Sequence, residues 1–113
     1  GLGQRGPFED PNAATWQPPV DIFETDEELF VVLELPGVQK DQVSVTIEAG
    51  TLSISGVRLK SIPELTRHVH QMEIPYGYFA RHIRLATGSA LDQVEADYEN
   101  GYLRVRIPKG AKR

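Results

Sequence analysis

The sequence VEADYENGYLRVRIP (residues 94–108) alternates apolar and polar side chains on both sides of Asn100-Gly101. Both central residues of a tight two-residue hairpin turn need a positive φ, and Asn-Gly adopts it readily. Successive side chains of a strand point to opposite faces, so each half of this segment has one apolar face. The segment therefore predicts a β-hairpin with a buried face. Its apolar rows are Val94, Ala96 and Tyr98 before the turn and Leu103, Val105 and Ile107 after it.

Similar short runs precede this hairpin and are separated by turn residues. The run Leu29–Leu35 is apolar on both faces, which is typical of a central strand that is covered on both sides. About eight strands at near-regular spacing, without an amphipathic helix, indicate an all-β antiparallel sandwich or barrel. The expected strands centre on residues 20–22, 29–35, 43–48, 52–56, 67–72, 79–85, 94–98 and 103–107.

The chain has 113 residues, a length that fits one domain. Residues 1–18 are rich in glycine and proline without any periodicity, and we expect them to form a flexible arm. The folded domain is expected at 19–109 and a short tail at 110–113. The longest apolar run, Leu29–Leu33, is far shorter than the roughly 20 residues that span a bilayer, and no leader is expected.

Composition narrows the classes of partner. The absence of cysteine excludes disulfides, thiol catalysis and cysteine-bound metal centres, and fits a reducing compartment, so we expect a cytoplasmic protein. The sequence pI is about 5.3, whereas nucleic-acid-binding domains exceed about 9, so we expect no nucleic acid as partner. Because no apolar run is long enough to span a bilayer, we expect no membrane as partner either. Residues 1–56 carry a net charge of −8 and residues 57–113 a net charge of +4. Such halves attract each other within one chain or between two copies.

The sequence has none of the common catalytic signatures, such as Gly-x-Ser-x-Gly, Gly-x-x-x-x-Gly-Lys or His-Glu-x-x-His. We expect no enzyme activity, no cofactor and no metal site. His68 and His70 would share one face of a strand, and His82 lies in a neighbouring run. Zinc needs three or four converging ligands, and nothing in the sequence ensures convergence. We therefore interpret these histidines as polar residues of an edge strand.

Arg81 is unusual, because it shares a face with Phe79, Ile83 and Leu85 when its run is read as a strand. A guanidinium in an apolar row needs a carboxylate, since an unpaired buried charge costs several kcal/mol. We therefore predict that Arg81 is paired.

Two apolar rows in otherwise polar strands allow two interpretations. The rows are Val43, Val45 and Ile47 in one strand and Val94, Ala96 and Tyr98 in another. If these strands are neighbours at the mouth of the sandwich, the rows form a groove for an extended peptide. The residues alone favour the other interpretation, in which both rows belong to the core.

The hairpin also carries a family resemblance. Ala96-x-x-x-Asn100-Gly101-Tyr102-Leu103, followed by Val105-x-Ile107-Pro108-Lys109, resembles the signature of small heat-shock proteins in the last strands of the alpha-crystallin domain. The other segments that resemble family counterparts are Val20-Asp21-Ile22-x-Glu24-Thr25, Leu35-Pro36-Gly37-Val38-x-Lys40, Leu52-x-Ile54-x-Gly56 and Tyr76-Gly77-Tyr78-Phe79-x-Arg81. The resemblance covers about residues 16–109 and is closest to the bacterial and plant branch, because a long stretch separates Gly56 from Phe79.

The resemblance implies an immunoglobulin-like sandwich that dimerises by exchanging the strand at 67–72, which pairs with the partner's strand at 20–24. It implies that Arg81 makes ion pairs near this contact. It also implies that the groove receives an Ile-x-Ile or Ile-x-Val segment from another chain's tail, which makes the groove the favoured interpretation. The implied groove residues are Val43, Val45, Ile47, Val94 and Ala96, and the implied dimer residues are Val20, Ile22, Arg67, His68, Val69, His70, Met72 and Arg81.

The function implied is that of an ATP-independent holding chaperone, which binds partly unfolded client proteins and prevents their aggregation. We expect a homodimer formed by strand exchange, with higher oligomers only when full-length arms and a tail segment are present. One alternative is a monomeric β-sandwich adaptor of the co-chaperone kind, which binds a folded partner. Another is a β-sandwich hydrolase or sugar-binding module, which needs a pocket with acids or stacked aromatics, whereas the nine aromatic residues are spread along the chain.

Overall fold

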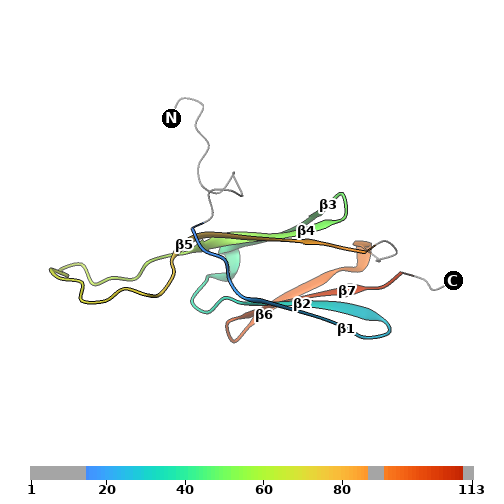
Figure 1. The fold of residues 1–113 in the computed structure, drawn as a ribbon, viewed down its shortest axis with the longest axis horizontal. Coiled ribbons are helices and arrows are strands. Elements are labelled where there is room, and N and C mark those ends of the chain that lie inside the picture. The colour runs from blue at the N-terminus through green and yellow to red at the C-terminus, as the bar shows by residue number, and fades with distance from the viewer. Residues whose placement is uncertain (1–14, 87–90, 111–113) are drawn as a thin grey trace, which may run out of the picture.

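Two antiparallel sheets stack face to face in the computed structural model, which describes residues 15–86 and 91–110 (Figure 1). One sheet has the strand order β1-β2-β7-β6 and the other has the order β3-β4-β5, so the prediction of an all-β sandwich is confirmed. None of the helices in these ranges is long and apolar enough to cross a membrane. The strands are β1 (Val20–Glu24), β2 (Glu28–Glu34), β3 (Val43–Glu48), β4 (Thr51–Arg58), β5 (Gly77–Arg84), β6 (Glu95–Glu99) and β7 (Tyr102–Pro108).

β2 lies between β1 and β7, the central place that its two apolar faces predict. Val31 and Leu33 point into the sandwich and are fully buried. Phe30 and Val32 point to the outer face of the same sheet and are only half-buried. The expectation that this strand is covered on both sides is therefore wrong for the single chain, because the second sheet packs on its inner face alone.

The core fills the space between the two sheets with aliphatic side chains and Phe79. Every second residue of β4 is buried. Gly56 occupies one of these inward positions, where a Cβ would lie 2.3 Å from the Gln42 carbonyl oxygen and 2.8 Å from Cζ of Phe79. Only glycine therefore allows β4 to pass this close to its neighbours. The buried core residues are Val31, Leu33, Leu35, Val38, Leu52, Ile54, Phe79, Leu85, Leu103, Val105 and Ile107.

The β6–β7 hairpin has the turn that its sequence predicts. Asn100 has a φ of 54° and Gly101 a φ of 84°, both in the left-handed region. Glu99 pairs with Tyr102, which is the register of a two-residue loop. The turn also holds the next connection in place, because the backbone N–H of Leu35 donates to the Gly101 carbonyl oxygen at 2.7 Å.

Residues 15–19 close one lateral edge of the sandwich. Trp16 forms a bridge with Phe79 of β5, and the two ring centroids lie 5.4 Å apart. The carbonyl oxygen of Pro18 accepts a hydrogen bond from Nη1 of Arg81 at 3.0 Å, and β1 begins shortly afterwards. β5 and β1 therefore share this edge, which leaves β3 and β6 together at the opposite one (Figure 1).

The chain packs onto the sandwich before the expected boundary at residue 19. Pro18 is fully buried, and the ring of Trp16 is half-buried against the core. The remainder of the expected arm, residues 1–14, and residues 111–113 of the expected tail lie outside the described residues. Residues 15–18 are therefore part of the folded unit.

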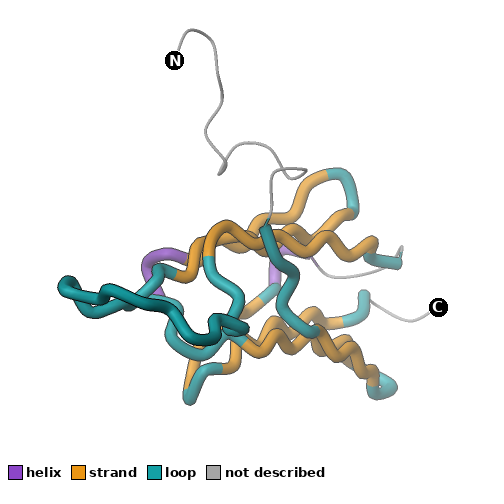
Figure 2. Tube along the Cα trace, turned by 60° about the vertical axis from the view of Figure 1, so that its left-hand side comes forward, coloured by secondary structure: helices purple, strands orange, loops and turns teal. Residues whose placement is uncertain are grey.

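Residues 59–76 form a long loop that projects beyond the end of the sandwich (Figures 1 and 2). The described residues form seven strands, and the expected strand at 67–72 is not among them. A strand needs a neighbouring edge to bond its N–H and C=O groups, and this segment extends away from both sheets of its own chain. It can become a strand only beside another chain, and that pairing stays a prediction.

Candidate functional site

β3 presents an apolar row at the open lateral edge of the sandwich. Val43, Val45 and Ile47 point inward, pack against the core and remain half-buried. The alternate residues, such as Thr46 and Glu48, point outward and are exposed. Because β4 is the only described neighbour of β3, the other side of β3 offers free backbone groups to an added strand.

β6 presents a matching row from the other sheet. Val94 lies just before the strand and is half-buried, whereas Ala96 is exposed. Ala96 pairs in register with the buried Val105, which places its methyl group on the inner side of the sheet. Tyr98 follows on the same side, and its hydroxyl donates to the Leu35 carbonyl oxygen at 2.6 Å.

The observed positions of these apolar rows contain elements of both interpretations of the sequence, since the rows touch the core and also lie at an open edge. The row on β3 packs against the core together with Val94 and Tyr98, as core residues do. The same side chains keep part of their surface open at the edge between β3 and β6. An extended peptide at such an edge can bond to the free strand backbone and place alternate apolar side chains against the rows.

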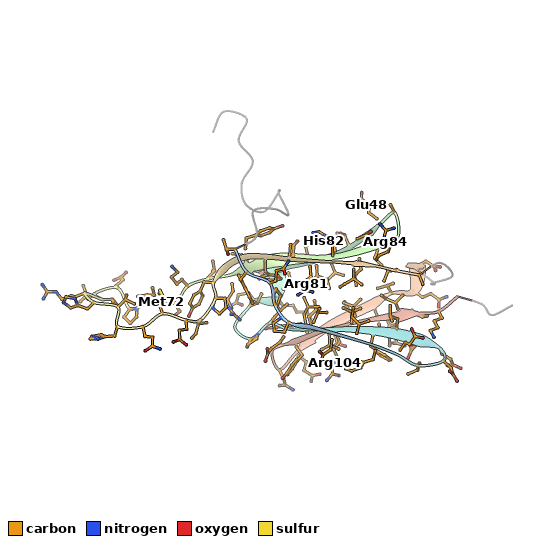
Figure 3. The ribbon with its side chains drawn as sticks, in the orientation of Figure 1. Glu48, Met72, Arg81, His82, Arg84 and Arg104 are labelled. Carbon is orange, nitrogen blue, oxygen red and sulfur yellow. The ribbon has the colours of Figure 1, made fainter. Side chains whose placement is uncertain are left out.

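The long loop exposes apolar side chains that the described chain does not cover. Leu65 is 90% exposed, and Val69 and Ile74 are each more than half exposed. Met72 lies on the projecting part of the loop, well away from the sandwich (Figure 3). Apolar residues gathered on one projecting segment are typical of a protein interaction surface. The exposed apolar residues of the loop are Leu59, Ile62, Leu65, Val69, Met72 and Ile74.

β1 is an edge strand with a neighbour on the β2 side only, among the strands described. Ile22 is 49% exposed although it stands opposite the buried Val31, because nothing on the far side of β1 covers it in residues 15–86 and 91–110. The loop does not reach this edge within one chain (Figure 1). The expected dimer residues therefore form separate surfaces: Val20 and Ile22 on β1, and Arg67, His68, Val69, His70 and Met72 on the loop.

Arg58, the last residue of β4, fixes the base of the loop and is only 9% exposed. Its Nε and Nη2 donate to the Pro75 carbonyl oxygen at 3.0 and 2.7 Å, and its Nη1 donates to that of Pro36 at 3.0 Å. The guanidinium carbon also lies 4.1 Å from the ring centroid of Trp16 and 5.9 Å from that of Tyr76. One side chain thus ties both ends of the loop to the β2–β3 connection and to the N-terminal segment.

Arg81 points inward beside Ile54, as its apolar neighbours predict. Its partner is the Pro18 carbonyl oxygen, and no carboxylate of the described residues lies within ion-pair distance. A backbone carbonyl therefore takes the place of the expected carboxylate in the single chain. Sequence reasoning missed Arg58, which stands on the buried side of β4 two residues after Gly56. Arg81 is singled out in the sequence because it is a charged residue in the apolar row of a strand, and the same criterion identifies Arg58.

The three histidines lie in two separate places rather than along one edge strand. His82 points outward from β5, where its Nδ1 lies 2.9 Å from the Ser53 hydroxyl oxygen (Figure 3). His68 and His70 lie on the projecting loop. Within the described part of the chain, no three side chains of the metal-ligating types gather at one point.

Comparisons with known proteins point to one family. A family model described as the Hsp20/alpha crystallin family matches residues 21–113. Over 91 residues the chain is 42% identical to the 16.9 kDa class I heat shock protein 3 of Oryza sativa, which covers 80% of this chain and 61% of that protein. It is 34% identical over 92 residues to small heat shock protein C4 of Rickettsia felis, which covers 81% and 56%. The chain thus spans less than two thirds of the length of these relatives.

Solved structures agree with this relationship. A small heat-shock protein from Xylella fastidiosa, described as having a distinct high order structure, is similar with a TM-score of 0.81 and 33% identity over 88% of this chain and 92% of that chain. The protein hspA from Xanthomonas axonopodis gives a TM-score of 0.76 and 35% identity over 85% and 96%.

Proposed function

Because the chain belongs to the Hsp20/alpha-crystallin family, we propose that it is an ATP-independent holding chaperone. Such a protein occupies the apolar surface of partly unfolded clients and so competes with their aggregation. The observation that carries the proposal is the open edge between β3 and β6, where apolar rows keep part of their surface exposed beside free strand edges.

The groove at this edge fits an extended segment with apolar residues two positions apart. Side chains at i and i+2 of a strand point the same way, and Val43, Val45 and Ile47 repeat with the same period. A client segment or the tail of another chain therefore meets one row on β3 and a second row on β6. Backbone hydrogen bonds supply affinity that depends little on client sequence, which suits a protein with many clients.

A second part of the proposal is a homodimer in which each loop places residues 67–72 against β1 of the partner. This segment has no strand neighbour in the described chain, and β1 has a free edge. Asp21 and Glu24 lie on β1, and Arg67 lies in the segment, so the contact brings opposite charges together. It also covers the exposed side chains of Ile22 and Val69.

Holding activity is tested by heating an aggregation-prone enzyme without ATP and recording light scattering at increasing ratios of this chain. We expect scattering to fall as the ratio rises. A variant with a lysine in the groove, Ala96→Lys, should suppress aggregation several-fold less well, because the groove would then present a charge to apolar side chains. Thr46→Lys adds the same charge on the outer face of β3 and should leave suppression unchanged. Equal activity of the two variants would contradict the groove assignment.

The strand-exchanged dimer is tested with a proline in the loop. Val69→Pro removes an N–H from the exchanged strand and should yield a monomer by light scattering on a sizing column at low protein concentration and high salt, where weak contacts between charged surfaces do not persist. Glu64→Pro is the matched control, because residues 63–66 form a turn in which Thr66 N–H donates to the Pro63 carbonyl oxygen and position 64 accepts proline. If Val69→Pro remains dimeric under these dilute, high-salt conditions, the exchange is wrong even where holding activity is present.

A further inference from the structure

The sheet face turned away from the core carries an apolar patch on β1, β2 and β7. Phe23 of β1 pairs with Phe30 of β2, and Val32 lies two residues further along β2. Phe23 is 55% exposed and Tyr102 of β7 is 44% exposed. The outer-sheet patch is a shallow hollow of about 520 Å³ lined by Asp21, Phe23, Phe30, Val32, Tyr102 and Arg104.

Two charges flank Val32 in one row across the strands. Asp21 pairs in register with Val32, and Val32 pairs with Arg104. Adjacent strands lie about 4.8 Å apart, so the acid and the base are about 10 Å apart on opposite sides of Val32. Asp97 of β6 pairs in register with Arg104 on the same face, but among the described residues Asp21 and Arg104 form no ion pair, whereas Arg106 in the next row is bonded to two glutamates. Arg104 projects from the lower sheet, away from β5 (Figure 3).

This row is complementary to itself under a two-fold rotation. If a second copy is related by an axis in the contact plane and parallel to the strands, each Asp21 faces the Arg104 of the other copy. Val32 and Phe30 lie on the axis and meet their own counterparts. Packed sheets are about 10 Å apart, a distance that the side chains of arginine and aspartate span together. The same patch on both copies is the arrangement that closed two-fold dimers use.

We infer that the outer-sheet patch binds the same patch of a second copy of this chain. The contact uses neither the groove nor the loop and, of the side chains assigned to the proposed strand exchange, shares only Asp21, so it does not depend on the proposed chaperone function. A standard interface buries about 800 Å² per partner, and a patch of six side chains is smaller. The association is therefore weak and concentration-dependent, and it weakens further with salt because its charges lie near solvent.

The experiment is sedimentation equilibrium of the full chain over a wide concentration range, at low and at high salt. The background is Val69→Pro, so that the outer-sheet contact is measured apart from any exchange of the loop. Arg104→Asp and Asp21→Arg should each lower the association constant about tenfold, since two symmetry-related attractions become repulsions. The double variant that carries both changes should restore it to within about threefold, because acid and base then face each other again.

Control variants separate this contact from other causes. Arg84→Asp makes the same charge change on the outer face of β5 and should leave the association constant unchanged. Val32→Lys places a charge on the axis and should abolish the association while far-UV circular dichroism stays the same. The inference is overturned if the chain does not self-associate in this background, or if the double variant stays as weak as the single ones. It is also overturned if Val32→Lys lowers client binding without changing the mass.

Discussion

Replacing Arg58 by alanine is the change that best tests how the loop is held. The guanidinium donates to two carbonyl oxygens, those of Pro75 and Pro36, and lies over the ring of Trp16. Alanine removes all of these contacts at a site that is 9% exposed, and both carbonyl oxygens lose a donor.

The loss of stability follows from these contacts. Pro36 and Pro75 are exposed residues whose carbonyl oxygens can bond to water instead, so each of the three lost hydrogen bonds costs about 1 kcal/mol. The cation–π contact with Trp16 adds about 1 kcal/mol. Removing a buried charge returns part of its desolvation penalty. We therefore expect Arg58→Ala to lower the free energy of unfolding by about 3 kcal/mol and the melting temperature by roughly 15 °C.

Urea unfolding, followed by circular dichroism and by the fluorescence of Trp16, measures this loss. Trp16 is the single tryptophan of the chain, so its emission reports on the base of the loop directly. Arg58→Lys keeps the charge but not the forked donors, and should recover less than half of the loss. Arg84→Ala removes an exposed arginine and should cost under about 0.5 kcal/mol. If Arg58→Ala costs no more than Arg84→Ala, the side chain does not hold the loop.

Two further changes test the packing around the site. Gly56→Ala forces a Cβ against the Gln42 carbonyl oxygen and the ring of Phe79, so it should destabilise the chain by about 3 kcal/mol or more. The loss is measured as a fall in melting temperature. A melting temperature within a few degrees of that of the unchanged chain would show that β4 can move aside. Tyr98→Phe removes the hydrogen bond to the Leu35 carbonyl oxygen and should lower the free energy of unfolding in urea by about 1 kcal/mol, with an unchanged m-value. An unchanged midpoint of urea unfolding would show that this bond adds no net stability.

The local sequence pattern was sufficient to predict the strands that the structure contains. Alternation with a period of two depends on neighbours a few residues apart, so it identified the β6–β7 hairpin and the central place of β2. The Asn100-Gly101 turn was predictable for the same reason, since positive φ at two adjacent positions is a property of these two residues. The apolar row on β3 was predictable in the same way, but the residues alone left open whether it lies in the core or at an open edge.

The local sequence pattern could not predict contacts between residues that are far apart in the chain. Arg58 falls just after the strand expected at 52–56, and only the fold brings Pro36, Pro75 and Trp16 around it. The segment 67–72 has the composition of a strand, but strand formation needs an edge, and its own chain offers none nearby.

Apart from the segment 67–72, the sequence by itself determined which of the described residues form strands and which side of each strand is apolar, because both depend on short-range alternation and turn chemistry. Only the tertiary structure decided which apolar surfaces stay uncovered. The strand order leaves the β3 and β6 edges open, the loop projecting and the outer face of β2 exposed. The physical reason is that covering an apolar surface requires contacts between residues far apart in the chain. The local sequence pattern carries no information about which element packs against that surface.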